Sequence, residues 1–198
     1  MPVDVRWATT DDAPALAILL CAMATHYRQT PLDHGRAAAT ARQWLSDESP
    51  AYPHFALAFL DGEPAGLASV AIAHPGIDLE RLMFLKDLFV RDGARDRGVG
   101  RAIIGFLAGY CVERGIGRID LTAEDWNEGA LRFYDRLGAE RHGQKIFLRL
   151  SGDALNRVAR TRRRPGAKAG VHQARQDSRS ARRRASRQPP RLRHSMAK

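Results

Sequence analysis

The stretch LFVRDGARDRGVGRAII, residues 88–104, constrains the fold of this chain more than any other part of the sequence. An apolar run of strand character leads into a charged turn with Gly98 and Gly100, and the turn leads into an amphipathic helical pattern. A strand, a glycine turn and a helix in this order aim free backbone N–H groups and the positive end of a helix dipole at one point. The stretch therefore predicts a site for an anion, and first of all for a phosphate-bearing ligand.

Two common phosphate-binding loops do not fit this turn. A Walker loop that starts at Gly93 reaches Gly98 at the right spacing, but Val99 and Gly100 stand where that loop needs lysine and a hydroxyl residue. A dinucleotide fingerprint that starts at Gly98 needs a third glycine where this chain has Ile103, and the turn comes after several strands instead of opening the fold. The sequence therefore indicates another class of phosphate ligand.

The rest of the pattern is that of a mixed α/β domain, with a hairpin in its first half and strand-to-helix crossovers in its second. Asp61-Gly62 joins two apolar runs and predicts the hairpin turn. Helix-capping residues and Pro14 precede the first apolar helical run. The expected strands cover residues 3–8, 54–60, 63–73, 81–90, 117–125 and 144–150, and the expected helices cover 9–27, 34–46, 99–114 and 127–137.

Charge divides the chain into two parts. Residues 157–198 hold 15 Arg and Lys against the single acid Asp177, whereas residues 1–156 hold 17 basic and 21 acidic groups. Apolar periodicity also ends near Arg157, so this part cannot bury enough apolar area to offset the entropy of ordering it. We expect a folded domain over residues 1–156 and an Arg-rich disordered tail over 157–198.

The pattern Arg95-x-x-Gly98-x-Gly100 resembles the pyrophosphate loop of the GCN5-related N-acetyltransferases (GNAT), which reads Gln/Arg-x-x-Gly-x-Gly/Ala. The strand LKDLFV, the strand IDLTAEDWN and the helix NEGALRFYDRLGAE follow in the order of that superfamily, and DWN with Tyr134 seven residues later is most like its diamine acetyltransferase branch. The resemblance covers residues 3–156. It implies an α/β fold with a mixed, mostly antiparallel sheet of six to seven strands and about four helices, and a V-shaped splay between the strands at 82–90 and 117–123.

The resemblance also implies an enzyme that transfers acetyl from acetyl-coenzyme A to a primary amine by direct attack on the thioester. Consecutive amides of the turn would cup the pyrophosphate, glycines would let the backbone come close, and arginines would raise the positive potential. The turn residues in these roles are Arg95, Asp96, Arg97, Gly98, Val99, Gly100 and Arg101. Asp96 departs from the family, since its carboxylate must point away from the phosphates.

The pantetheine arm of the cofactor would pair with the backbone of Leu88, Phe89 and Val90, although the same side chains also fit a plain core. Asn127 is expected as a helix N-cap, as a polar contact to the pantetheine, or as both. Tyr134 is expected to be the general acid that protonates the leaving thiolate, with a core aromatic as the alternative.

The proton acceptor is not settled by the sequence. Lys86-Asp87 stands where the diamine branch has a Glu-Asp pair, so Lys86 is expected to select the acceptor, and Asp87 is expected either to face the acceptor or to pair with an arginine. The remaining expected acceptor contacts are His26 and Tyr27, at the end of the first helix, and Thr122 and Glu124, after the strand at 117–123.

A small amine is the first choice of acceptor, an amino-acid or antibiotic amine the second, and a protein lysine or N-terminus the last. The alternative function is nonspecific nucleic-acid binding by the basic tail, with the acyl-coenzyme A domain as a passenger. No metal site is expected, because the seven histidines show no ligand spacing. The apolar stretch 13–24 is too short to span a bilayer, so we expect a cytoplasmic protein without a membrane partner; a homodimer stays open.

Overall fold

The computed structural model describes residues 2–46, 54–74 and 79–161. These residues fall into two units, one that ends at Ala139 and one that begins at Glu140. The expected tail lies outside the described residues from position 162 onward. No helix among the described residues combines the length and the apolar character needed to cross a membrane.

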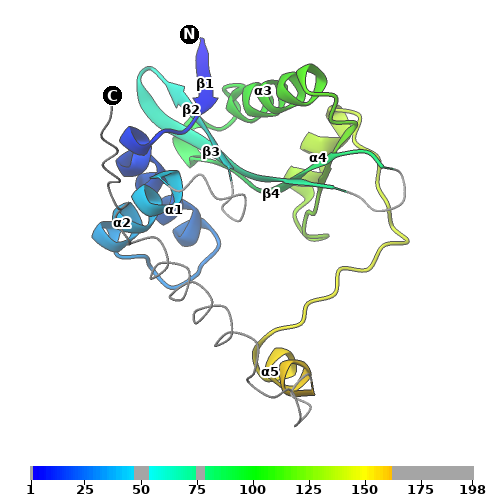
Figure 1. Ribbon diagram of the computed structural model, residues 1–198. Coiled ribbons are helices and arrows are strands. Elements are labelled where there is room, and N and C mark those ends of the chain that lie inside the picture. Colours follow the sequence, from blue (N-terminus) through cyan, green and yellow to red (C-terminus); the bar gives the residue numbers. More distant parts are fainter. Residues whose placement is uncertain (1, 47–53, 75–78, 162–198) are drawn as a thin grey trace, which may run out of the picture. The chain divides into compact units, whose positions relative to one another are not determined.

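The first unit is built on one mixed sheet whose strands follow chain order (Figure 1). Neighbouring strands are antiparallel except for the last pair, which is parallel. The mixed, mostly antiparallel sheet is therefore confirmed, but the six to seven strands predicted are wrong, because the described residues form five. The strands are β1 (Val3–Trp7), β2 (His54–Leu60), β3 (Glu63–Ala73), β4 (Leu82–Val90) and β5 (Arg118–Leu121).

The predicted hairpin joins β2 to β3. Asp61 and Gly62 both have positive φ, at 57° and 83°, and two successive positive φ values define the type I′ turn that matches the twist of the flanking strands. The turn pairs Leu60 with Glu63 at the start of the ladder. This local signal therefore sets the register beside the turn, and a bulge between Ala58 and Phe59 shifts the register of the rest of the ladder.

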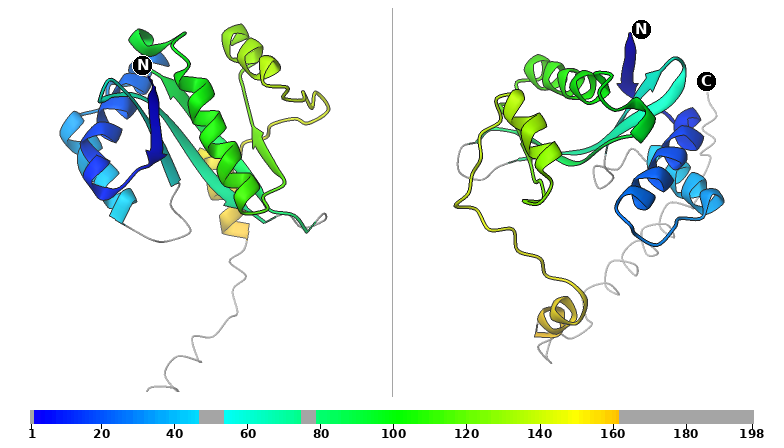
Figure 2. Two further views of the ribbon diagram at one scale, coloured as in Figure 1. Left: turned by 90° about the horizontal axis from the view of Figure 1, so that it is seen from above. Right: turned by 180° about the vertical axis from the view of Figure 1, so that it is seen from behind.

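Helices cover both faces of the sheet (Figure 2). Helix α3 (Val99–Glu113) packs on one face, here called the α3 face, while α1 (Ala13–His26) and α2 (His34–Ser46) pack on the other, the α1 face. Fully burying one Leu or Ile side chain stabilises the fold by about 1.5–3 kcal/mol, so the two layers set the strand orientation. The core includes Met83, Leu85, Val99, Ile103 and Leu107 on the α3 face, and Leu16, Leu19, Leu57, Leu67 and Phe89 on the α1 face.

A β-bulge interrupts the ladder between β3 and β4. Ser69 pairs with Asp87, and the next residue, Val70, pairs with Leu85. Lys86 is therefore an extra residue with no partner position on β3. A bulge of this kind bends the strand and re-aims its side chains, and this bend lies where β4 approaches the expected site.

An ion pair fixes the start of α1 to β1. Both terminal nitrogens of Arg6 donate to the Asp12 carboxylate, at 2.6 and 2.7 Å, and the Thr9 backbone N–H and hydroxyl donate to the same carboxylate. These donors, Arg6 first, lower the pKa of Asp12 to about 2 even though its partial burial acts the other way. The buried carboxylate is thus kept ionised and fully paired.

The second unit corrects another expectation. Residues 144–150, predicted as a last strand, form no strand, and Ile146, Phe147 and Leu148 are 82%, 66% and 85% exposed. A strand requires a ladder of hydrogen bonds to a neighbour, which an apolar pattern alone does not supply. Helix α5 (Gly152–Thr161), where the sequence predicts none, follows this segment, so the described residues hold five α-helices where about four were expected.

Candidate active site

The sheet opens between β4 and β5. The parallel ladder joins Leu82–Leu85 to Arg118–Leu121 and ends there, while β4 continues to Val90. Beyond the ladder the chain leaves β5 towards α4 (Glu128–Arg136). The predicted splay is confirmed. The last five residues of β4 pair with β3 on one side, but on their other side β5 offers them no pairing partner.

In residues 88–90 of β4, the side chains pack in the core while the backbone lies along the open edge of the sheet. The Leu88 and Val90 side chains pack on the α3 face, and Phe89 is buried on the α1 face. No strand of the described residues pairs with this edge beyond Leu85, so a ligand can pair there like a strand, although the Val90 carbonyl already accepts from Arg95 Nε at 3.2 Å. The two interpretations of these residues, core and ligand binding, are therefore compatible.

The glycine turn adopts the conformation needed to present amides. After a 3-10 turn, Asp92–Ala94, the chain has positive φ at Asp96 (58°) and Gly98 (81°). Gly98 is the N-cap of α3, and the first backbone bond of the helix runs from Ala102 to the Gly98 carbonyl at 2.9 Å. The N–H groups of the first turn have no intrahelical acceptor and point along the positive end of the helix dipole.

The three arginines of the turn differ in their contacts. Arg97 pairs with Asp61 of the hairpin at 3.3 Å. Arg95 bonds within its own turn and to α1. Arg101 is exposed on the first turn of α3 and makes no ion pair within the described part of the chain. Of the three side chains, Arg101 is the one whose charge is free for an anion at the helix N-terminus.

Gly100 brings α4 against the turn. A Cβ atom built on Gly100 would lie 3.4 Å from Cζ of Phe133 and 3.7 Å from Cγ2 of Val90. The ring of Phe133 is also 5.2 Å from that of Tyr134, edge to face. Sequence reasoning missed Phe133, whose only signal is its place on the apolar side of a short helix.

Asn127 and Tyr134, both expected at the site, lie at the N-cap of α4 and within α4. The Asn127 side chain accepts a bond from the Ala130 N–H at 3.1 Å, so the capping role is present. Tyr134 is half-buried, and burial raises its pKa to about 12, with a smaller contribution from the nearby phenol of Tyr27. The Tyr134 hydroxyl is therefore protonated at neutral pH, and the Tyr27 side chain lies within electrostatic range of it.

The bulge brings Lys86 and Asp87 together. Leu85 and Leu88 both pack on the α3 face, so the two residues between them fall on the α1 face. Lys86 Nζ lies 3.3 Å from Asp87 Oδ1, and the two side chains are 66% and 34% exposed. Within the described residues, the partner of Asp87 is Lys86 and not an arginine.

The end of α1 lies over the same face of β4. The ring of His26 is 5.9 Å from that of Phe89 and 5.1 Å from that of Tyr27, which is 43% exposed. Thr122 and Glu124 are exposed in the connection from β5 to α4. The structure thus places His26 and Tyr27 beside β4, whereas Thr122 and Glu124 form no hydrogen bond or ion pair with them.

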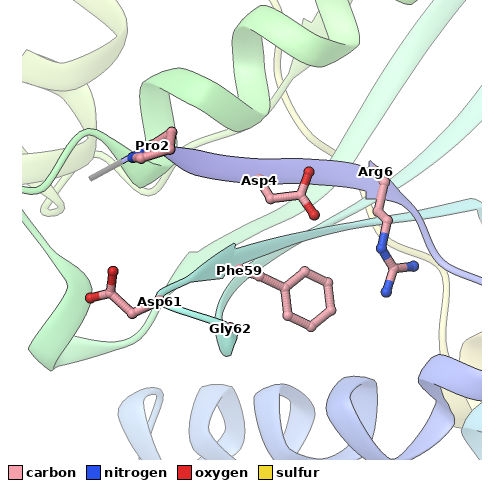
Figure 3. A pocket seen from close by; sticks show the side chains of 6 residues that line it. All are labelled: Pro2, Asp4, Arg6, Phe59, Asp61 and Gly62. Carbon is pink, nitrogen blue, oxygen red and sulfur yellow. The ribbon is translucent and has the colours of Figure 1, made fainter.

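A pocket of about 470 Å³ lies at the other edge of the sheet (Figure 3). Two of its charged side chains are already paired: Asp61 with Arg97, and Arg6 with Asp12, while Arg6 also lies over the ring of Phe59 at 4.8 Å. Since β1 and β5 are opposite edges of the sheet, this pocket is separate from the splay. Its lining is Pro2, Asp4, Arg6, Phe59, Asp61 and Gly62.

A sheet that splays beside a glycine turn at a helix N-terminus is the arrangement that the sequence resemblance implies, and comparison with known proteins agrees. The model of the acetyltransferase (GNAT) family matches residues 19–139, which is more than half of the chain. The chain belongs to this family.

Individual relatives are more distant. "L-ornithine N5-acetyltransferase NATA1" of Arabidopsis thaliana is 31% identical over 85 residues, which cover 43% of this chain and only 37% of the plant protein. "Thialysine N-epsilon-acetyltransferase" of Caenorhabditis elegans is 28% identical over 124 residues, 61% of this chain and 76% of the relative. The solved structure of the integron cassette protein VCH_CASS6, from the mobile metagenome of V. cholerae, is 27% identical with a TM-score of 0.73, and the match covers 80% of this chain and 98% of that one.

Proposed function

We propose that this protein is an N-acetyltransferase that moves an acetyl group from acetyl-coenzyme A to a primary amine of a small molecule. The observation that carries the proposal is the position of the α3 N-terminus next to the open edge of β4. Coenzyme A needs both features, because it combines a pyrophosphate with an amide-rich arm. Family membership supports the same class of reaction.

The residues of the turn fit the phosphates. Asp96 and Gly98 hold the backbone in the left-handed region, and a Cβ built on Gly98 would meet nothing within 4 Å. Arg101 adds an uncommitted positive charge at the same end of the helix. The open edge of β4 from Lys86 to Val90 would receive the pantetheine amides as an added strand receives its neighbour.

The acceptor that fits best has both an amine and a carboxylate. Lys86 and Asp87 form an exposed pair of opposite charges on the α1 face, and each can exchange its partner for the opposite charge of a zwitterion. Ornithine and thialysine, named in two relatives, are amino acids of this kind, and these names support the likeness to the diamine branch. We therefore favour the side-chain amine of a small amino acid.

Tyr134 is proposed to act on the leaving thiolate. When bound, acetyl-coenzyme A supplies an activated acetyl group and a thiol leaving group with a pKa near 8.5. With the pKa of Tyr134 at about 12, complete transfer of its proton to that thiolate would be uphill by about 5 kcal/mol. The Tyr134 hydroxyl therefore stabilises the charge that develops on the thiolate sulfur as a hydrogen-bond donor. The proton that converts the thiolate to the thiol is one that the attacking amine loses.

Asp87 is proposed to orient the ammonium group of the acceptor and to take up its proton. Its carboxylate is one-third exposed and lies on the same face as His26. A carboxylate is a weak base, so its contribution is mainly to hold the amine near β4 in the geometry for attack.

The test is a screen of the full chain with acetyl-coenzyme A against paired acceptors, with thiol release as the readout. Ornithine and lysine are compared with putrescine and cadaverine, which lack the carboxylate. We expect higher kcat/KM for the amino acids. Turnover of the diamines alone would contradict the proposed acceptor, and absence of turnover together with absence of cofactor binding would contradict the proposed function.

A further inference from the structure

Arg95 begins the glycine turn, but its guanidinium is directed at protein groups. Nε donates to the Val90 carbonyl at 3.2 Å. Nη2 forms an ion pair with Asp92 Oδ1 at 2.9 Å and lies 3.2 Å from Nδ1 and 3.4 Å from Nε2 of the His26 ring. Nε thus has a carbonyl acceptor, Nη2 lies between the Asp92 carboxylate and the His26 ring, and Nη1 makes no hydrogen bond or ion pair within the described residues.

The partners of Arg95 belong to three different elements. Val90 is the last residue of β4, Asp92 lies in the 3-10 turn, and His26 is the last residue of α1, 69 positions away from Arg95 along the chain. The ring of His26 also contacts that of Phe89. One side chain therefore joins the end of the cofactor strand to the end of the helix that carries the expected acceptor contacts.

We propose that Arg95 is a positioning residue that sets the distance between the acceptor side of the site, at His26 and Tyr27, and the carboxyl end of β4. This inference rests on the proposed acetyltransferase function. It differs from a phosphate contact, because the Arg95 guanidinium donates to the Val90 carbonyl and lies against Asp92 and the His26 ring. Phosphate binding is left to the amides of α3 and to Arg101.

The chemistry of the contact requires a guanidinium. Its planar fork can reach a carbonyl, a carboxylate and a ring nitrogen at the same time, whereas an ammonium group keeps the charge but cannot match these directions from one position. Arg95 is 42% exposed and Asp92 is 81% exposed, so their ion pair contributes little to folding stability. Loss of the fork is therefore expected to change geometry and to leave the fold intact.

Steady-state kinetics with ornithine as the probe, and calorimetry with acetyl-coenzyme A, test the inference on Arg95→Lys, His26→Ala and the double variant. We expect about a tenfold rise in the acceptor KM for each single variant, less than about a threefold change in the cofactor Kd, and a double variant no worse than either single one, as for residues that act through one contact. The matched control is Arg91→Lys: Arg91 lies in the same loop and donates to the Pro64 carbonyl at 2.9 Å, away from α1.

Hydrogen exchange of the ligand-free chain gives a second readout that does not depend on activity. Arg95→Lys and His26→Ala should both speed exchange at the carboxyl end of α1, residues 23–29, and Arg91→Lys should not. The inference is overturned if exchange in this segment is unchanged, or if Arg95→Lys weakens acetyl-coenzyme A binding while the acceptor KM stays constant. If the wild-type chain binds no acetyl-coenzyme A but the exchange result is as expected, the structural role of the Arg95–His26 contact is supported and the proposed function is contradicted.

Discussion

Phe133 of α4 lies beside Gly100, in the first turn of α3, at the place that a side chain on Gly100 would enter. A methyl group at position 100 would lie 3.4 Å from the ring, at the limit of an ordinary van der Waals contact. This contact fixes α4, and with it Tyr134, relative to the proposed phosphate turn. A small residue at position 100 is thus required by the packing of two helices as well as by the approach of a ligand.

Gly100→Val is expected to cost about 1–2 kcal/mol of unfolding free energy more than Gly105→Val, because a branched side chain at position 100 must displace Phe133. Gly105 is the control: it lies in the same helix, is exposed, and a Cβ built there has nothing within 4 Å. Chemical denaturation of both variants measures the difference. Equal stabilities would show that Phe133 does not pack on Gly100.

Gly98→Ala is expected to cost about 1–2 kcal/mol through backbone strain alone, since φ at Gly98 is 81° and a side chain would have open space. Gly93→Ala serves for comparison, because a Cβ there also meets nothing within 4 Å and no positive φ is involved. Thermal unfolding should separate the two variants. A Gly93→Ala variant that loses as much as Gly98→Ala would contradict the left-handed N-cap.

Asp12→Asn is expected to destabilise the fold by about 1–2 kcal/mol at neutral pH and to flatten the acid limb of the stability curve. The folded pKa of Asp12, about 2, lies below its ordinary value of 3.8. The stabilisation is therefore complete above about pH 5 and is lost as the pH falls towards 2. Denaturation midpoints from pH 2 to 7 test this, with the exposed neighbour Asp11→Asn expected to stay within about 0.5 kcal/mol of wild type.

The sequence predicted the parts of this fold that depend on local signals. Asp61-Gly62 selects its own turn, the helix over 34–46 is found as expected, and the splay follows from a strand order that the resemblance implies. The prediction of a strand at 144–150 was wrong, because an apolar pattern does not show which strand edge the segment would pair with. The Arg95 contact with His26 spans 69 positions and depends on packing, so no sequence motif predicts it.

The bulge at Lys86 also depends on distant pairing and not on a local sequence signal. The sequence indicates that Lys86 and Asp87 point to opposite faces unless a bulge intervenes, and only the pairing of Ser69 with Asp87 and of Val70 with Leu85 decides between the two. One inserted residue changes the acceptor side of the proposed site from a single charge to a charge pair. Such insertions are set by the register of the whole sheet.

Tyr134→Phe is expected to lower kcat about 10²-fold or more and to leave acetyl-coenzyme A affinity within a few-fold, because the lost donor acts on charge that develops during transfer. With the pKa of Tyr134 at about 12, wild-type kcat should show no alkaline loss from this group up to about pH 10. Tyr110→Phe, on α3 against Trp7, should keep the wild-type kcat. If Tyr134→Phe does so too, Tyr134 is only a packing residue.

Lys86→Glu is expected to raise kcat/KM for putrescine about tenfold or more and to lower it for ornithine, since the charge facing the acceptor changes sign. Lys86→Met removes the charge at similar length and should give intermediate values. Loss of all turnover in Lys86→Met, with the fold and cofactor binding intact, would make Lys86 a catalytic residue instead of a selector. Wild-type behaviour of both variants would show that Lys86 does not face the acceptor.

The central claim, that the α3 N-terminus and the open edge of β4 bind acetyl-coenzyme A, is tested most directly by calorimetric titration of the full chain with that compound. We expect saturable binding of one molecule per chain, weakened about tenfold in Arg101→Ala, which corresponds to about 1.4 kcal/mol, and unchanged in Arg42→Ala on α2. Absence of binding to the wild-type chain, or equal affinity in Arg101→Ala, would contradict the account of this site.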